Sequence, residues 1–157
     1  MGLGTAGIRK MQKDRKIVCP QCSAVNRLVA GRPASEARCG QCGQAMFKAH
    51  PADADAPSYE KHMSRNEIPV LVDVWAPWCG PCRMMAPAFA EAAGMLEPEV
   101  RLLKLNSEDE PQLASRLGIR GIPTMLLYKG GREIGRVSGA MSARQIVDWT
   151  RAQLGSA

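Results

Sequence analysis

The 157-residue chain has no apolar run long enough to cross a bilayer, and no apolar run of signal-peptide length follows its basic first residues. We therefore expect a cytoplasmic protein without a membrane segment. The first 16 residues contain no serine and no clear apolar face, which argues against an organelle-targeting segment. Met11 is an alternative start, and residues 1–10 would then be an extension of no structural consequence.

Aromatic residues are scarce, at 4% of the chain, and Phe47 is the only one within residues 1–50. The same 50 residues carry nine lysines and arginines against two acidic residues, so they hold the positive charge of the protein. Nucleic-acid surfaces combine clustered basic groups with aromatic side chains on which bases stack. Because these basic residues are spread out, we expect a solvated surface or a protein-docking face instead of a nucleic-acid partner.

None of the six cysteines is left over, because all fall into three Cys-x-x-Cys pairs, which argues against chemistry at an unpaired thiol. The pairs Cys19/Cys22 and Cys39/Cys42 are separated by sixteen residues, a spacing typical of four-cysteine zinc ribbons. Each pair suits a tight turn that points two sulfurs inward and directs backbone N–H groups at them. We therefore predict one Zn²⁺ ion held by four thiolates in a closed, structural site.

Residues 17–49 would form this zinc module, and about 33 residues cannot bury enough apolar surface to fold without the metal. Two disulfides are an alternative use of the four cysteines, although a cytosolic chain keeps such thiols reduced. Iron in the same four-thiolate cage is a second alternative. A third is a redox switch, in which oxidation of the thiolates would eject the zinc and change the docking of the module.

Composition divides the chain into a basic extension at 1–16, the zinc module at 17–49, a linker at 50–57 and a larger domain at 58–157. Residues 50–57 are small, acidic and bracketed by prolines, which is typical of a linker or of a poorly formed edge strand. His50 and His62 are isolated from other ligand-type residues, and we expect both to be ordinary surface residues.

The third pair, Cys79 and Cys82, follows the apolar run 70–76, which we expect to be a buried strand interrupted by Asp73. Pro81 suits the first turn of a helix, and Cys79 would then lie at the positive end of the helix dipole, where the thiolate is favoured. Cysteines three residues apart share one helix face and can close a small disulfide. The pattern indicates a redox site, with half of a metal site or simple burial as the competing interpretation.

The motif Trp78-Cys79-Gly80-Pro81-Cys82, with Asp73 in the strand before it, resembles the active site of the thioredoxin family. The resemblance extends from about residue 58 to residue 154. It implies an α/β fold in which a mixed central sheet has helices on both faces. With the four earlier cysteines, the chain resembles the zinc-binding two-module members of that family. One departure is Val74, where many thioredoxins have phenylalanine.

By this resemblance Cys79 is the nucleophile, Cys82 resolves the mixed disulfide, and Asp73 is the buried group that accepts a proton. Lys104 matches the family lysine near that carboxylate. An ion pair with Lys104 would lower the pKa of Asp73, whereas desolvation would raise it, and the sequence leaves the balance open.

The resemblance also implies a wall beside the dithiol. The Ile122–Pro123 peptide bond is expected to be cis, which would free the Ile122 backbone to pair with a substrate strand. Gly139 matches a family glycine of the same groove. Together with Trp78, these residues are expected to align the target disulfide.

The implied function is a protein disulfide reductase that acts on protein substrates by thiol–disulfide exchange and binds no organic cofactor. An NADPH-dependent thioredoxin reductase would regenerate the dithiol. An oxidase or isomerase is disfavoured, because Gly80-Pro81 lacks the histidine found between the cysteines of many oxidising relatives. A zinc-dependent binding module on an inactive redox scaffold is disfavoured by the intact cysteine pair.

The larger domain is expected to contain helices at 58–63, 81–96 and 111–117, a final helix after the capping box 142–145, and strands at 70–76, 100–106, 124–129 and 133–137. Pro87 lies inside the second of these helices, where it should cause a kink. The expected packing residues of that helix are Met84, Met85, Phe89 and Met95.

Overall fold

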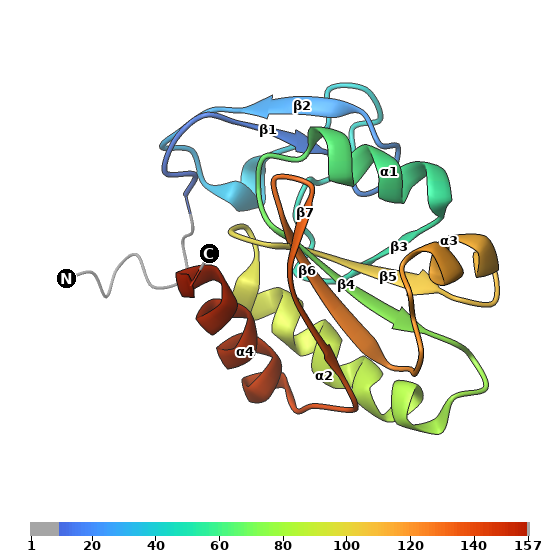
Figure 1. Ribbon diagram of the computed structural model, residues 1–157. Helices are drawn as coiled ribbons and strands as arrows, with labels where there is room; N and C mark the ends of the chain where they lie inside the picture. Colours follow the sequence, from blue (N-terminus) through green and yellow to red (C-terminus); the bar gives the residue numbers. More distant parts are fainter. Residues whose placement is uncertain (1–9, 157) are drawn as a thin grey trace.

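The structure, a computed structural model, describes residues 10–156, and residues 1–9 of the expected basic extension lie outside that range (Figure 1). Residues 10–49, called the front module below, contain a two-stranded antiparallel sheet. Its strands are β1 (Arg15–Val18) and β2 (Val25–Leu28), and a 3-10 helix, η2 (Ala34–Glu36), follows them. Strand β1 begins inside the stretch expected to be an extension. Met11, just before it, is buried among the apolar side chains of this front module.

The rest of the chain forms a five-stranded mixed sheet in the order β3-β5-β4-β6-β7. Its strands are β3 (Ala52–Ala54), β4 (Val70–Trp75), β5 (Arg101–Asn106), β6 (Thr124–Lys129) and β7 (Arg132–Ser138). Strands β3, β5 and β4 are parallel, whereas β4 with β6 and β6 with β7 are antiparallel. Of the two structures considered for the acidic stretch before the larger domain, the edge strand is the one that forms, as β3.

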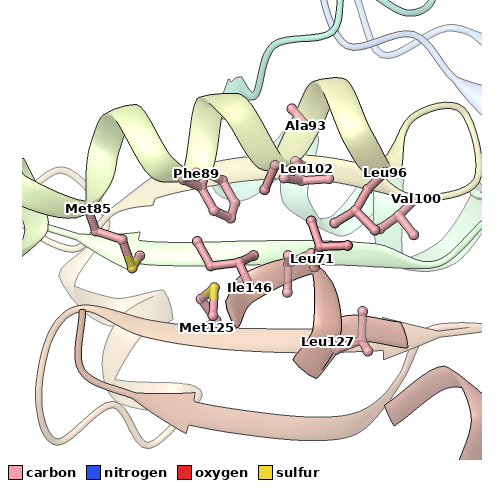
Figure 2. Packing of buried hydrophobic residues seen from close by; sticks show 12 residues of the cluster. Leu71, Met85, Phe89, Ala93, Leu96, Val100, Leu102, Met125, Leu127 and Ile146 are labelled. Atoms are coloured by element: carbon pink, nitrogen blue, oxygen red, sulfur yellow. The ribbon is translucent and has the colours of Figure 1, made fainter. Parts of the chain in front are cut away.

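Helices cover both faces of this sheet, as expected. One layer contains α2 (Gly80–Leu96) and α4 (Ala143–Ser156), and the other contains α1 (Ala56–Arg65) and α3 (Pro111–Arg116). Successive side chains of a strand point to opposite faces. Leu71 of β4 therefore packs towards α2 and α4 (Figure 2), whereas Val72 packs towards α1 and α3. Within residues 10–156, no helix combines the length and apolar character that crossing a membrane requires.

Helix α1 extends two residues beyond the expected range 58–63 at each end. Asp55, not Ser58, is the N-cap: the Asp55 carboxylate accepts a hydrogen bond from the Ser58 N–H, and the Ser58 hydroxyl accepts one from the Asp55 N–H. His62, expected at the surface, is only 2% exposed, and its Nδ1 lies 2.7 Å from the amide nitrogen of Asn66. Burial, together with the positive charge of Arg101, lowers the pKa of His62 to about 3.

Helix α2 continues through Pro87 and confirms most of its expected packing face. Met85 and Phe89 are buried, and Met95 packs against the same cluster. The prediction for Met84 was wrong, because its side chain is 79% exposed. Apolar character alone did not reveal that this position turns away from the face that carries Met85 and Phe89.

The front module docks onto the amino end of β5 through a buried charge pair. Arg101, the first residue of β5, is 1% exposed, and its guanidinium lies 3.2 Å from the carboxylate of Glu97. It also donates a hydrogen bond of 2.8 Å to the Met46 carbonyl and stacks 4.7 Å from the centre of the Phe47 ring. The second carboxylate oxygen of Glu97 accepts from the Ala49 N–H at 2.8 Å. One ion pair therefore holds the last turn of the front module.

A second set of contacts joins β1 to the segment between α1 and β4. The Val18 N–H donates to the side-chain oxygen of Asn66 at 3.0 Å, and the Lys16 N–H donates to the carboxylate of Glu67 at 2.8 Å. Ile68 packs in the apolar cluster of the front module. The module thus shares a core with the larger domain in addition to its polar contacts.

Arg101→Ala should destabilise the protein by roughly 3–5 kcal/mol, because the Glu97 carboxylate would stay buried without this cation. The double variant Arg101→Met/Glu97→Leu removes both charges and should be less destabilised than the single variant. Urea unfolding followed by tryptophan fluorescence gives both free energies. Wild-type stability for Arg101→Ala would show that the ion pair does not hold the two parts together.

Candidate redox centre and metal site

The redox pair lies where β4 passes into α2. Cys79 is the N-cap of α2, and its sulfur accepts a hydrogen bond of 3.2 Å from the Cys82 N–H. The two cysteines form a disulfide, with their Cα atoms 5.3 Å apart. Both are buried, at 4% and 2% exposure. Gly80 and Pro81 occupy the first helical turn, where the missing N–H of proline has no partner to lose.

The segment before β6 lies against this pair. The carbonyl oxygen of Ile122 is 3.8 Å from the Cys79 sulfur, and the Ile122–Pro123 peptide bond is cis, as expected. Gly139 follows β7 and donates its N–H to the Pro123 carbonyl at 2.9 Å. Its φ of 104° lies in the region that favours glycine. The structure therefore places Ile122 beside the disulfide, followed by Pro123, which is hydrogen-bonded to Gly139.

An open groove of about 730 Å³ runs from the disulfide towards α3. Trp78 and Pro81 line one side, and Ile119, Arg120 and Ile122 line the other. Trp78 is 65% exposed, and Met84 is another exposed apolar side chain in the first turns of α2. Sequence reasoning missed Arg120, which has no motif of its own and reaches the groove only because the chain folds back after α3.

Asp73 is fully buried in the central strand, and neither of its carboxylate oxygens has a hydrogen-bond partner within residues 10–156. Lys104 is directly opposite in β5, but its ammonium group lies over the ring of Trp75, 4.3 Å from the centroid. Desolvation raises the pKa of Asp73 to about 7, and the charge of Lys104 offsets only part of that rise. Desolvation therefore outweighs the charge of Lys104 in setting the pKa of Asp73, a comparison that the sequence left open.

The four remaining cysteines meet at one point of the front module. Their sulfurs all lie within 4.8 Å of one another, with separations of 3.7 Å for Cys19 and Cys42 and 3.6 Å for Cys22 and Cys39. A tetrahedral zinc site with Zn–S bonds of about 2.3 Å requires sulfur separations of about 3.8 Å. The donor set and its size therefore fit a four-thiolate metal ion.

Hydrogen-bond donors surround these sulfurs. The Gln21 N–H donates to Cys19 and the Gln41 N–H to Cys39, each over 3.3 Å, as the two tight turns predict. The side-chain amide of Asn26 also donates to Cys39 over 3.3 Å. The Cys42 N–H and this amide lower the pKa of Cys39 to about 6. The sequence did not reveal Asn26 as a partner of Cys39, because the two segments come together only in the folded chain.

A model of the thioredoxin family, described as "Thioredoxin", matches residues 51–152. Thioredoxin C-3 of Corynebacterium nephridii is 38% identical over 138 residues, which cover 88% of this chain and 94% of that protein. A thioredoxin of Synechocystis is 47% identical over 95 residues, which cover 60% of this chain and 88% of that protein. The solved structure of a mutant thioredoxin from Halobacterium salinarum is similar, with a TM-score of 0.61, 27% identity, and coverage of 68% of this chain and 93% of that one. The chain therefore belongs to the thioredoxin family, whose members are dithiol–disulfide oxidoreductases.

Proposed function

We propose that this protein reduces disulfides in other proteins with the Cys79/Cys82 dithiol. The observation that carries the proposal is the position of the pair: Cys79 caps α2 and opens onto a groove beside the Ile122 carbonyl. Unpaired N–H groups and the dipole at the start of a helix stabilise a thiolate there. Exposed Trp78 and Met84 supply apolar contacts suited to a protein surface.

The reaction starts from the dithiol. The Cys79 thiolate attacks one sulfur of the substrate disulfide, so the substrate S–S bond breaks, one substrate thiolate leaves, and a mixed disulfide forms. Cys82 then gives its proton to the Asp73 carboxylate and attacks the Cys79 sulfur, which releases the second substrate thiolate. The substrate gains two electrons and the Cys79/Cys82 pair is left as a disulfide. A thioredoxin reductase, drawing on NADPH, would return the two electrons.

Asp73 suits the proton-accepting role because its pKa of about 7 lies near the pH of the cytoplasm. The side chain shares the sheet face that is covered by α2, the helix that carries Cys82. Lys104 would stabilise the carboxylate form after the proton leaves. Ile122, Pro123 and Gly139 would hold the substrate backbone so that its disulfide meets Cys79 in line.

The front module would bind one Zn²⁺ ion through Cys19, Cys22, Cys39 and Cys42. Such an ion supplies no redox chemistry and acts as a structural crosslink. The close approach of the four cysteine sulfurs, and the interface that the front module shares with the larger domain, support a structural role for the module.

Cys79→Ser should abolish the reduction of insulin disulfides, because no thiolate remains in the groove to begin the exchange. Cys82→Ser should still attack but should accumulate mixed disulfides, since no second thiol releases the product. Turbidity of precipitating insulin measures turnover, and mass spectrometry detects the trapped adducts. A wild-type rate for Cys79→Ser would contradict the assignment of the nucleophile.

Asp73→Asn should change the pH dependence of stability. Because the folded pKa of Asp73 is about 7 and its ordinary value is 3.8, the folded state keeps a proton that the unfolded state releases. The contribution of Asp73 to stability is therefore greatest below about pH 4 and falls as the pH rises to about 7, by roughly 4 kcal/mol for a shift of about three pKa units. When both proteins contain the Cys79–Cys82 disulfide, Asp73→Asn should lack this fall and should be more stable than the wild type at pH 8.

Urea unfolding at a series of pH values gives the difference between the two proteins, in which the other titrating groups cancel. A difference that is constant from pH 4 to pH 8 would contradict the raised pKa. In stopped-flow measurements the same variant should slow release of the reduced product more than the first attack. Equal slowing of both steps would remove Asp73 from the proton-transfer step.

Removal of the metal should unfold the front module, because so short a chain depends on the ion for its folding free energy. In a Cys79→Ser/Cys82→Ser background, a chelator should abolish the hydrogen-exchange protection of residues 10–49 and leave most of residues 51–152 protected. The loss of docking contacts should lower the Tm of the larger domain by about 4–8 °C per kcal/mol lost, the range for a domain of this size. Full protection of residues 10–49 without metal would show that docking alone folds the module.

A further inference from the structure

One polar side chain of the front module connects its two cysteine turns. Asn26, in strand β2, places its amide nitrogen 3.2 Å from the Ala24 carbonyl and 3.3 Å from the sulfur of Cys39. Its amide oxygen accepts a hydrogen bond of 2.8 Å from the Gly40 N–H. All the polar atoms of this side chain are therefore engaged.

The partners belong to different turns. The Ala24 carbonyl also accepts from the Cys19 N–H at 2.8 Å, which closes the turn that holds the first cysteine pair. Cys39 and Gly40 begin the second turn. The backbone donors to Cys19 and Cys39 come from the same turn as the sulfur they contact. Apart from the cysteine sulfurs themselves, which contact one another across the site, the Asn26 side chain carries a hydrogen bond from the first turn to a sulfur of the second.

We propose that Asn26 is a positioning residue of the metal site, which orients the Cys39 thiolate and locks the two cysteine turns together so that the metal is retained. The inference rests on the metal site proposed above. Hydrogen-bond partners behind metal ligands fix ligand orientation, and their loss costs about 10- to 100-fold in metal affinity. Here the partner also fixes the relative position of the two halves of the site.

Asparagine suits this position because it offers a donor and an acceptor on one short, planar group. Aspartate keeps an acceptor for the Gly40 N–H but loses the donor to Cys39 and adds a negative charge beside a thiolate. Alanine loses every contact. Asn26→Asp therefore removes both donor contacts, to Cys39 and to the Ala24 carbonyl, and keeps the contact with Gly40, whereas Asn26→Ala removes all three.

The test uses the zinc-loaded full chain and measures transfer of zinc to excess 4-(2-pyridylazo)resorcinol. Asn26→Ala and Asn26→Asp should each release zinc about 10- to 100-fold faster than the wild type. Gln12→Ala is the matched control, because it removes an exposed amide of the front module that lies outside both cysteine turns and should keep the wild-type rate. In the cobalt-substituted protein, both Asn26 variants should shift the thiolate-to-cobalt charge-transfer band, which a general loss of stability would not move.

Release rates within twofold of the wild type for both Asn26 variants, with an unshifted cobalt band, would overturn the proposal. For a variant that loses zinc during purification, the cobalt dissociation constant replaces the rate. It should rise about 10- to 100-fold, and a value within twofold of the wild type would likewise overturn the proposal. A wild-type chain that binds neither metal would overturn both this inference and the metal site, while insulin reduction tests the redox proposal separately.

Discussion

The burial of strand β4 on both faces is the constraint on which the rest of the structure depends. Every residue from Val70 to Val74 is buried, between α2 and α4 on one side and α1 and α3 on the other. Parallel pairing with β5 carries both strands towards the same edge of the sheet, where ligands of α/β proteins commonly bind. The turn after β4 delivers Cys79 to that edge as the cap of α2.

The same strands place the front module at their other end. Ile68 precedes β4 and Arg101 begins β5, and both contact the front module. In Figure 1 the two-stranded sheet of that module is at the top and the start of α2 is at the lower right. The front module therefore contacts the beginnings of β4 and β5, whereas the Cys79–Cys82 disulfide follows the end of β4.

Arg101 and Asp73 are both buried, and the structure accommodates these two ionisable groups in different ways. Arg101 keeps its charge because Glu97 and the Met46 carbonyl replace the water it loses. The carboxylate of Asp73 has no hydrogen-bond partner within residues 10–156, so desolvation favours its protonated form and raises its pKa to about 7. The first arrangement fixes an interface, and the second leaves a group that can exchange a proton near neutral pH.

The spacing of the residues was enough to predict the three cysteine pairs and the strand and helix around Cys79, because these features depend on neighbouring residues. The cis bond at Pro123 was expected from the resemblance to thioredoxins alone. The burial of His62, the exposure of Met84 and the hydrogen bonds of Asn26 became visible only in the folded chain. These depend on contacts between distant segments, such as Val18 with Asn66 and Met46 with Arg101, which lie 48 and 55 residues apart. Desolvation of Asp73 likewise follows from how closely whole layers pack, and no local pattern encodes that quantity.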